Sequence, residues 1–217
     1  MNHIQGGIFM DENQEFVEDV VSLNDENNTP GKKKINWAAE IKELLITFVI
    51  CFVAVWTITT YVIKPVQVDG DSMYPTLVHE EVGAVNMLFV KMDGVERYDV
   101  VVVHNKAQDE NWVKRVIGLP GETISAKDDI VYINGQPLEE PYLDTEYVKD
   151  IRSKGNYFTE DFQEITLGED EYFLMGDNRV VSLDSRRVGP FQKEDIIGKD
   201  VYVVFPFDQM KMVRNPY

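Results

Sequence analysis

Residues 44–63, LLITFVICFVAVWTITTYVI, constrain this chain most, because these 20 residues include no charge. A helix rises about 1.5 Å per residue, so such a stretch reaches about 30 Å, the thickness of a bilayer core. A buried helix of a globular domain is usually shorter and polar on one face. A cleavable signal peptide fits poorly, since 43 residues precede the stretch and its apolar run is too long. The stretch therefore predicts a transmembrane anchor over 44–63.

Lysines flank this predicted anchor unequally. Four lysines lie within residues 32–42, before the anchor, whereas only Lys64 lies close behind it. Positive residues near a span stay on the cytoplasmic side of the membrane. We therefore expect a cytoplasmic N-terminus, with residues 64–217 outside the cytoplasm.

The first 43 residues are polar and acidic and include the breaker-rich run NDENNTPGKKK. This composition predicts a largely disordered cytoplasmic tail. The net charge of −17 argues against a nucleic-acid partner, because phosphates attract a basic surface. Cys51 is the single cysteine, so the fold has no intramolecular disulfide.

After residue 64 the pattern changes to short apolar runs separated by turn formers. Asn134-Gly135 favours a two-residue hairpin turn, 191–198 (FQKEDIIG) suggests a brief helical turn, and the acid-rich region 139–171 is expected to be a surface excursion. The predicted fold class is mainly β, an antiparallel sheet domain over 64–217 with one N-terminal transmembrane helix. The runs of strand length and composition are 82–90, 98–104, 111–118, 129–138, 171–177 and 201–207.

The stretch GDSMYPTL places Ser72 among turn formers, where it either caps a turn or attacks a substrate. A serine hydroxyl is a weak nucleophile until a base removes its proton. Of the three histidines, His3 lies across the predicted membrane, while His79 and His104 lie in the same part of the chain as the serine. Spacing does not exclude a triad with His104 and Asp99, since triads assemble in space.

A lysine is the other candidate base, provided that burial lowers its pKa from about 10.4. Lys114 lies in the apolar run NWVKRVIGLPG and shares a strand face with Trp112 and Val116. Arg115 points to the opposite face and cannot deprotonate, although its charge would help to lower the lysine pKa. Asp71 is the carboxylate expected to oppose that shift. Spacing alone, however, favours a pair of solvated basic residues on an edge strand.

A third polar stretch, GDNRVVSLDSR, follows the predicted strand EYFLM. The hydroxyl of Ser182 could accept a hydrogen bond from a neutral lysine amine and orient it. Asp184 and Arg186 are spaced to pair and to brace the loop. An ordinary polar loop has the same composition.

Together these stretches resemble the type I signal peptidase (leader peptidase) family of the compact bacterial kind. The resemblance covers residues 44–205 and rests on GDSMYPTL, YDVVVVH, VKRVIGLPGE and GDNRVVSLDSR, in the family's order and spacing. It implies a Ser/Lys serine endopeptidase that removes signal peptides from exported preproteins through an acyl-enzyme. It implies signal peptides and the lipid bilayer as partners, and no cofactor or metal.

By motif, Ser72 resembles the family's nucleophile and Lys114 its general base. Ser182 resembles the hydroxyl that orients the lysine, and Asp184 and Arg186 resemble the supporting pair. Small pockets in the substrate groove would favour alanine at the first and third positions before the cut, the Ala-x-Ala preference. The positions that resemble the groove lining are Val66, Val68, Met73, Leu77, Trp112 and Val113.

Two positions depart from the family pattern. Gly70 stands where some members have a serine that stabilises the oxyanion, which leaves backbone N–H groups for this task, chiefly that of Ser72. Val180-Val181 stands where polar residues are commoner.

Two alternatives to a secretory protease fit these motifs less well. One is a non-catalytic relative that serves in surface or pilus assembly, which the presence of both Ser72 and Lys114 disfavours. The other is a self-cleaving regulator, which would need a DNA-binding N-terminal domain where this chain has a predicted membrane span.

Overall fold

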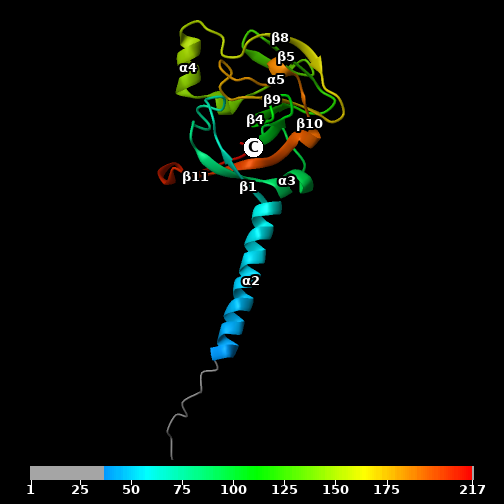
Figure 1. The fold of residues 1–217 in the computed structure, drawn as a ribbon. Helices are drawn as coiled ribbons and strands as arrows, with labels where there is room; N and C mark the ends of the chain where they lie inside the picture. The colour runs from blue at the N-terminus through cyan, green and yellow to red at the C-terminus, as the bar shows by residue number, and fades with distance from the viewer. Residues whose placement is uncertain (1–36, 217) are drawn as a thin grey trace, which may run out of the picture. The chain divides into compact units, whose positions relative to one another are not determined.

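The computed structural model describes residues 37–216, so the predicted acidic tail lies largely outside the described residues. Helix α2, Trp37–Tyr61, contains 25 residues, none of them buried, and is long and apolar enough to cross a membrane (Figure 1). It begins before the predicted span because 38–43 contain good helix formers and no breaker. It ends before Ile63, where strand β1 starts, because Pro65 disfavours helical backbone in the residue before it.

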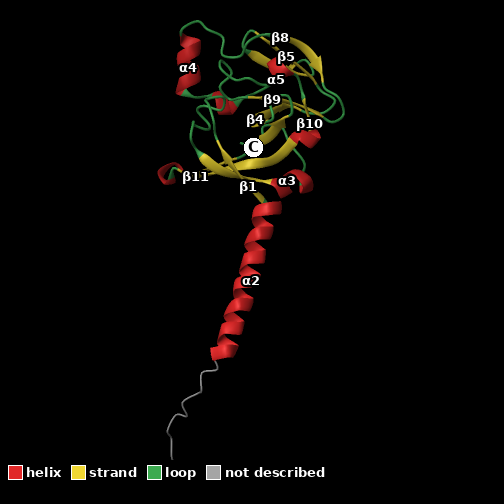
Figure 2. Cartoon of the chain, viewed as in Figure 1, coloured by secondary structure: helices red, strands yellow, loops and turns green. Residues whose placement is uncertain are grey.

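Beyond α2 most of the regular secondary structure is strand, drawn in yellow in Figure 2, and all strand pairs are antiparallel. This agrees with the predicted fold class. The larger sheet has the order β1-β2-β11-β3-β4-β9-β10, with β12 also paired to β11, and the smaller has the order β7-β6-β5-β8. The larger sheet comprises β1 (Ile63–Gln67), β2 (Val82–Asn86), β3 (Val100–Asn105), β4 (Glu110–Gly118), β9 (Glu171–Met175), β10 (Phe191–Gln192), β11 (Ile196–Phe205) and β12 (Lys211–Val213). The smaller sheet comprises β5 (Thr123–Lys127), β6 (Ile130–Ile133), β7 (Gln136–Pro137) and β8 (Phe162–Thr166).

Strands β3 and β4 lie in the middle of the larger sheet and are buried on both faces over much of their length. Alternate side chains of a strand point to opposite faces. Val100 and Val102 accordingly join one apolar cluster, and Val101 and Val103 join another. A third cluster, around Ile117, includes residues of both sheets. Residues 113–118 of β4 are therefore buried, the polar Lys114 and Arg115 included.

The local sequence pattern predicts the hairpin turn correctly, but it does not predict the helix that follows β2. Asn134 and Gly135 both have positive φ, 50° and 74°, as a two-residue hairpin turn requires. The run 82–90 was expected to be one strand, but helix α3, Met87–Met92, replaces its second half. The Asn86 side chain starts this helix by accepting a hydrogen bond from the Leu88 N–H at 2.9 Å.

The regions 191–198 and 139–171 contain more regular structure than the sequence suggested. Only 193–195 of the first form a helical turn, η2, between strands β10 and β11. The second holds η1 (Pro141–Leu143), helix α4 (Glu146–Ser153) and strand β8, which pairs with β5. Leu143, Val148 and Phe158 form a small buried cluster there, so this region is not only a surface excursion.

Substitution of Gly118, at the end of β4, tests how tightly the two sheets pack there. A Cβ at this position would lie 2.7 Å from Leu167 Cδ1 and 2.9 Å from Phe173 Cβ. Gly118→Ala is therefore expected to lower the free energy of unfolding by about 1–3 kcal/mol. Thermal unfolding of the full chain in detergent measures this as a lower Tm.

Gly168→Ala is the matched control, because a Cβ there would meet the movable carboxylate of Glu171, at 3.3 Å. Equal Tm values for Gly118→Ala and Gly168→Ala would contradict the tight packing at Gly118.

Candidate active site

Ser72 lies in a series of tight turns after β1, and two buried side chains attach this segment to the larger sheet. Met73 and Leu77 are 1% and 0% exposed and pack in the same apolar cluster as valines of β3. The N–H groups of Tyr74 and Leu77 donate to the carbonyls of Asp71 and Met73 at 3.1 and 3.0 Å. Ser72 itself stays partly exposed on a fixed backbone.

Strand β4 brings Lys114 to this serine. The Lys114 Nζ donates a hydrogen bond of 2.8 Å to Ser72 Oγ. Lys114 is 4% exposed, and its Nζ lies 5.4 Å from the centroid of the Trp112 ring. Because β4 lies between β3 and β9, the interpretation as solvated basic residues on an edge strand is wrong.

Burial lowers the pKa of Lys114 from its ordinary value of 10.5 to about 8. The carboxylates of Asp184 and Asp177 oppose this shift, and the positive charge of Arg186 adds to it. The direction agrees with the prediction, but Asp71 and Arg115, the charges expected from sequence proximity, are not the main ones. At mildly alkaline pH a large fraction of Lys114 is thus a neutral amine in contact with a hydroxyl.

Asp184 and Arg186 form a bidentate ion pair within the 176–186 loop. Arg186 donates from Nε to Asp184 Oδ1 at 2.9 Å and from Nη2 to Oδ2 at 2.8 Å. Burial raises the pKa of Asp184. The hydrogen bonds and the positive charge of Arg186 lower it, as do the Gly176 N–H and the nearby Ser182 hydroxyl, so that the pKa lies below its ordinary value. The pair is therefore fully charged at neutral pH.

Ser182 is buried in this loop, but no hydrogen bond joins its hydroxyl to Lys114. Its Oγ has no hydrogen-bond partner of standard geometry among residues 37–216. It packs instead against Gly176: a Cβ on that glycine would lie 2.3 Å from Ser182 Oγ and 2.3 Å from the Ser72 carbonyl oxygen. The predicted contact between Ser182 and Lys114 is thus not formed in this structure. Ser182 nevertheless lies close to residues 70–77, the serine segment.

Asp177 is a site residue that sequence reasoning missed. Its carboxylate accepts hydrogen bonds from Arg115 Nε at 2.8 Å, Arg115 Nη2 at 2.6 Å and Thr76 Oγ1 at 2.5 Å. The next N–H, that of Asn178, donates to the Ser72 carbonyl at 3.0 Å. The DN pair of GDNR thus joins the serine segment to β4. The motif marked this pair as polar, but only the fold shows what it contacts.

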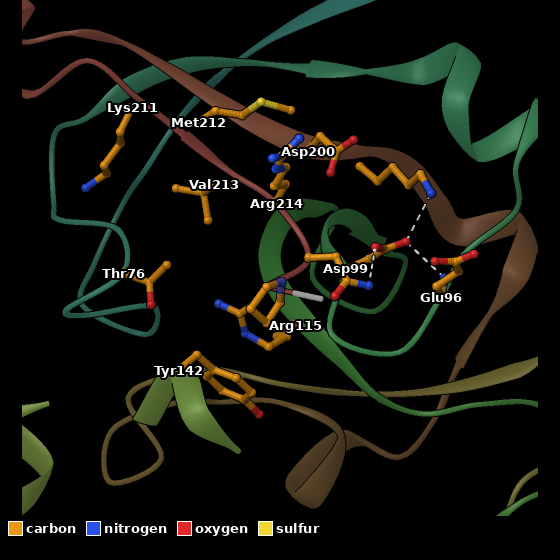
Figure 3. A pocket seen from close by; sticks show the side chains of 13 residues that line it. Thr76, Glu96, Asp99, Arg115, Tyr142, Asp200, Lys211, Met212, Val213 and Arg214 are labelled. Atoms are coloured by element: carbon orange, nitrogen blue, oxygen red, sulfur yellow. Dashed lines mark hydrogen bonds and ion pairs between the residues drawn. The ribbon is translucent and has the colours of Figure 1, made fainter. Parts of the chain in front are cut away.

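Arg115 lies on the opposite side of β4 from Lys114, as predicted, but it is buried rather than solvated. Its guanidinium stacks on Tyr142 at 4.1 Å from the ring centroid. Figure 3 shows both beside Thr76 on the wall of a second cavity, distinct from the one that contains Ser72. Lys114 and Arg115 therefore face different cavities.

Neither histidine of the described chain is hydrogen-bonded to Ser72. His79 Nδ1 accepts a hydrogen bond from the Gly70 N–H at 3.0 Å, and His104 contacts Asn111 at 3.2 Å. Asp99 binds Lys199 at 3.2 Å instead of orienting a histidine. The geometry therefore does not form the alternative triad.

A groove of about 660 Å³ runs past Ser72 and Lys114 between the end of β1 and strand β4. Four of the six predicted lining residues lie on it: Val68, Met73, Trp112 and Val113. Val66 and Leu77 do not, because both pack against the apolar cluster beneath the serine segment. Other residues of the lining are Gln67, Asp69, Gly70, Asp71, Gln108, Glu110, Asn111, Val181 and Leu183.

The chain is similar to known proteins over most of its length. The family model described as signal peptidase, peptidase S26, matches residues 41–205. The chain belongs to the signal peptidase family. It is 38% identical to signal peptidase I S of Bacillus subtilis over 190 residues, which is 87% of this chain and 98% of that protein. It is 35% identical to signal peptidase IB of Staphylococcus aureus, over 82% of this chain and 96% of the relative.

A crystal structure of a signal peptidase I from Enterococcus faecalis is 37% identical and covers 48% of this chain and 95% of its own, with a TM-score of 0.45. As a signal peptidase, this protein is a membrane-anchored serine protease that removes signal peptides.

Substitution of Gly176 tests whether this signal peptidase needs the close approach between the Ser72 backbone and the 176–186 loop. A methyl group there would displace the Ser72 carbonyl or Ser182. Displacing the Ser72 backbone by about 1 Å can cost about 100-fold in rate. Gly176→Ala is therefore expected to lower kcat for a preprotein by about ten- to 100-fold.

Gly168→Ala again serves as control and should retain normal cleavage, since a Cβ there would meet only the end of the Glu171 side chain and no part of the serine segment. Wild-type kcat in Gly176→Ala would show that the loop can move without disturbing the serine.

Proposed function

We propose that Ser72 is the nucleophile of this signal peptidase and that Lys114 is its general base. The observation that carries the proposal is the 2.8 Å hydrogen bond between Ser72 Oγ and a buried lysine amine. A general base works best when its pKa lies near the operating pH, and burial lowers the pKa of Lys114 to about 8.

The reaction then proceeds in two steps. The neutral Lys114 amine takes the proton of Ser72 Oγ as this oxygen attacks the scissile carbonyl carbon. The C–N bond breaks when the Lys114 ammonium returns the proton to the leaving amine, and the signal peptide stays esterified to Ser72. Water attacks this ester with the same amine as base, which releases the signal peptide carboxylate and restores the serine.

Backbone N–H groups supply the oxyanion site in this proposal. The Ser72 N–H donates to no group among the described residues, so it is available to a substrate oxygen. Gly70 offers no hydroxyl, and its N–H is bound to His79 Nδ1. One such donor is typically worth about 3–4 kcal/mol of transition-state stabilisation.

The groove supports a preference for small side chains before the cut. Val68, Met73 and Val113 line it next to Ser72 and are 5%, 1% and 8% exposed. In this proposal, these apolar walls form small pockets that favour a side chain as small as alanine. We therefore assign Ala-x-Ala sites of secretory preproteins as the substrates.

The 176–186 loop has a supporting role. The Asp184–Arg186 pair adjusts the charge around Lys114, and Asp184 also accepts the Gly176 N–H at 3.0 Å. Ser182 lies close to the Ser72 backbone, and a shift of its side chain rotamer on substrate binding would let it orient the lysine amine.

The anchor places this chemistry at the membrane. Lysine asymmetry around α2 supports a cytoplasmic N-terminus and an external protease domain. Ten residues, 62–71, separate the helix from Ser72. At about 3.5 Å per residue this link reaches at most about 35 Å. The nucleophile therefore works close to the bilayer surface, where a signal peptide presents its cleavage site.

Incubation of a purified preprotein with the full chain in detergent tests the dyad. Ser72→Ala and Lys114→Ala should each abolish cleavage, because nucleophile and base act as a unit. Mass spectrometry of wild-type products should locate the cut after Ala-x-Ala. A matched substrate with Phe in place of the last alanine should remain intact.

His104→Ala and His79→Ala are the controls and should keep most of the activity. Substantial cleavage by Lys114→Ala would refute the dyad and favour a histidine base.

The pH dependence of kcat/KM tests the identity of the base. Only the free amine of Lys114 accepts a proton, so kcat/KM should rise with pH and level off above about 8. Asp184→Asn removes a charge that stabilises the ammonium form and should move this rise to lower pH. Arg186→Gln removes a charge that destabilises it and should move the rise to higher pH.

A double variant, His79→Ala/His104→Ala, should leave the midpoint of the rise in place. A midpoint that moves by more than about one pH unit in that variant would show that a histidine titrates instead.

A further inference from the structure

The loop between β9 and α5 (Ser185–Val188) reverses the usual distribution of polar and apolar residues. Val180, Val181 and Leu183 are 56%, 60% and 43% exposed. The polar residues that alternate with or flank them are buried: Asn178, Arg179, Ser182, Asp184 and Ser185. An isolated exposed aliphatic residue is common, but three together beside an active site indicate a binding surface. We call Val180, Val181 and Leu183 the apolar shelf.

Buried hydrogen bonds hold the apolar shelf in this exposed position. The Asn178 N–H donates to the Ser72 carbonyl, and the Ser182 N–H donates to the Asn178 carbonyl, each at 3.0 Å. Arg179 Nε donates to the Gly176 carbonyl at 3.0 Å, and Arg186 Nη2 donates to the Arg179 carbonyl at 2.8 Å. Turning the aliphatic side chains inward would break these bonds.

The apolar shelf lies between two hollows. Val181 and Leu183 line the groove that contains Ser72 and Lys114. All three shelf residues also line a neighbouring hollow of about 430 Å³, beside Tyr157 and Phe158. The groove therefore meets at the shelf a second hollow, whose lining also includes the charged side chains of Glu160, Arg186 and Arg187.

We propose that the apolar shelf binds the residues that follow the cut, and that this protease favours apolar side chains at the first two of these positions. The proposal rests on the proposed function, in which Val68, Met73 and Val113 take the side chains before the cut. Val181 and Leu183 line the same groove as Ser72 but are not among these residues, so they are available to the part of the substrate that follows the cut.

A lipid surface is the other apolar partner that such residues could contact. The peptide is favoured because Val181 and Leu183 line the same groove as Ser72 and Lys114, and because Asn178 links Val181 to the Ser72 carbonyl through backbone hydrogen bonds. One apolar contact in a binding pocket discriminates between substrates by about ten- to 200-fold.

Two preproteins that differ only in the two residues after Ala-x-Ala, Leu-Leu in one and Ser-Ser in the other, test the proposal. Wild type in detergent should cut the Leu-Leu substrate with a kcat/KM about ten-fold higher or more. In Val181→Ser and in Leu183→Ser this ratio should fall toward one. Val188→Ser is the matched control, because Val188 is 45% exposed but lies outside both hollows, and its ratio should stay at the wild-type value.

Equal cleavage of the two substrates by wild type would overturn the proposal without any variant, so a variant that fails to fold does not decide the matter. A ratio unchanged by both shelf substitutions would also overturn it. If Val181→Ser and Leu183→Ser lose cleavage of both substrates in lipid vesicles, while the ratio of the two kcat/KM values stays unchanged, the shelf contacts the membrane instead. Failure of the proposed function is distinguishable, since it appears as cleavage by Ser72→Ala or Lys114→Ala.

Discussion

The buried carboxylate of Asp177 is the group on which the geometry of this site depends. It joins Arg115 of β4 to Thr76 of the serine segment, and the adjoining N–H of Asn178 fixes the Ser72 carbonyl. Removing one partner of a buried ion pair typically costs about 3–5 kcal/mol. The contact between serine and lysine therefore depends on a neighbouring pair that takes no part in the chemistry.

The same network explains how carboxylates can lie near a lysine whose pKa is lowered. Asp177 and Asp184 both favour the ammonium form of Lys114, yet burial outweighs them. Each of the two carboxylates is also bound by its own arginine, Arg115 or Arg186, which neutralises much of its charge. Paired acids can thus hold the structure together without returning the pKa of Lys114 to its ordinary value.

Features that depend on neighbouring residues were predictable from the sequence, and features that depend on strand order were not. The apolar helix, the Asn134-Gly135 turn and the strand content follow from local composition. The burial of Arg115 depends on β4 being a central strand, which no local pattern reveals. Helix α4 was not predicted because it is only eight residues long and lies in an acid-rich region with many turn formers, although Tyr147, Val148 and Ile151 share its apolar face. Val66 and Leu77 were placed in the groove by motif, yet their side chains pack into the apolar cluster.

The absence of a side chain at Gly176 has a consequence for how the site is built. The serine segment and the 176–186 loop approach each other so closely that not even a methyl group fits between them. Two surfaces in such contact leave little freedom for either backbone to adjust when a peptide arrives. The positions of Ser72 and of the donors around it are therefore set when the protein folds, and binding does not have to reorganise them. The site is preorganised, and the cost of ordering it is met during folding rather than in each catalytic cycle.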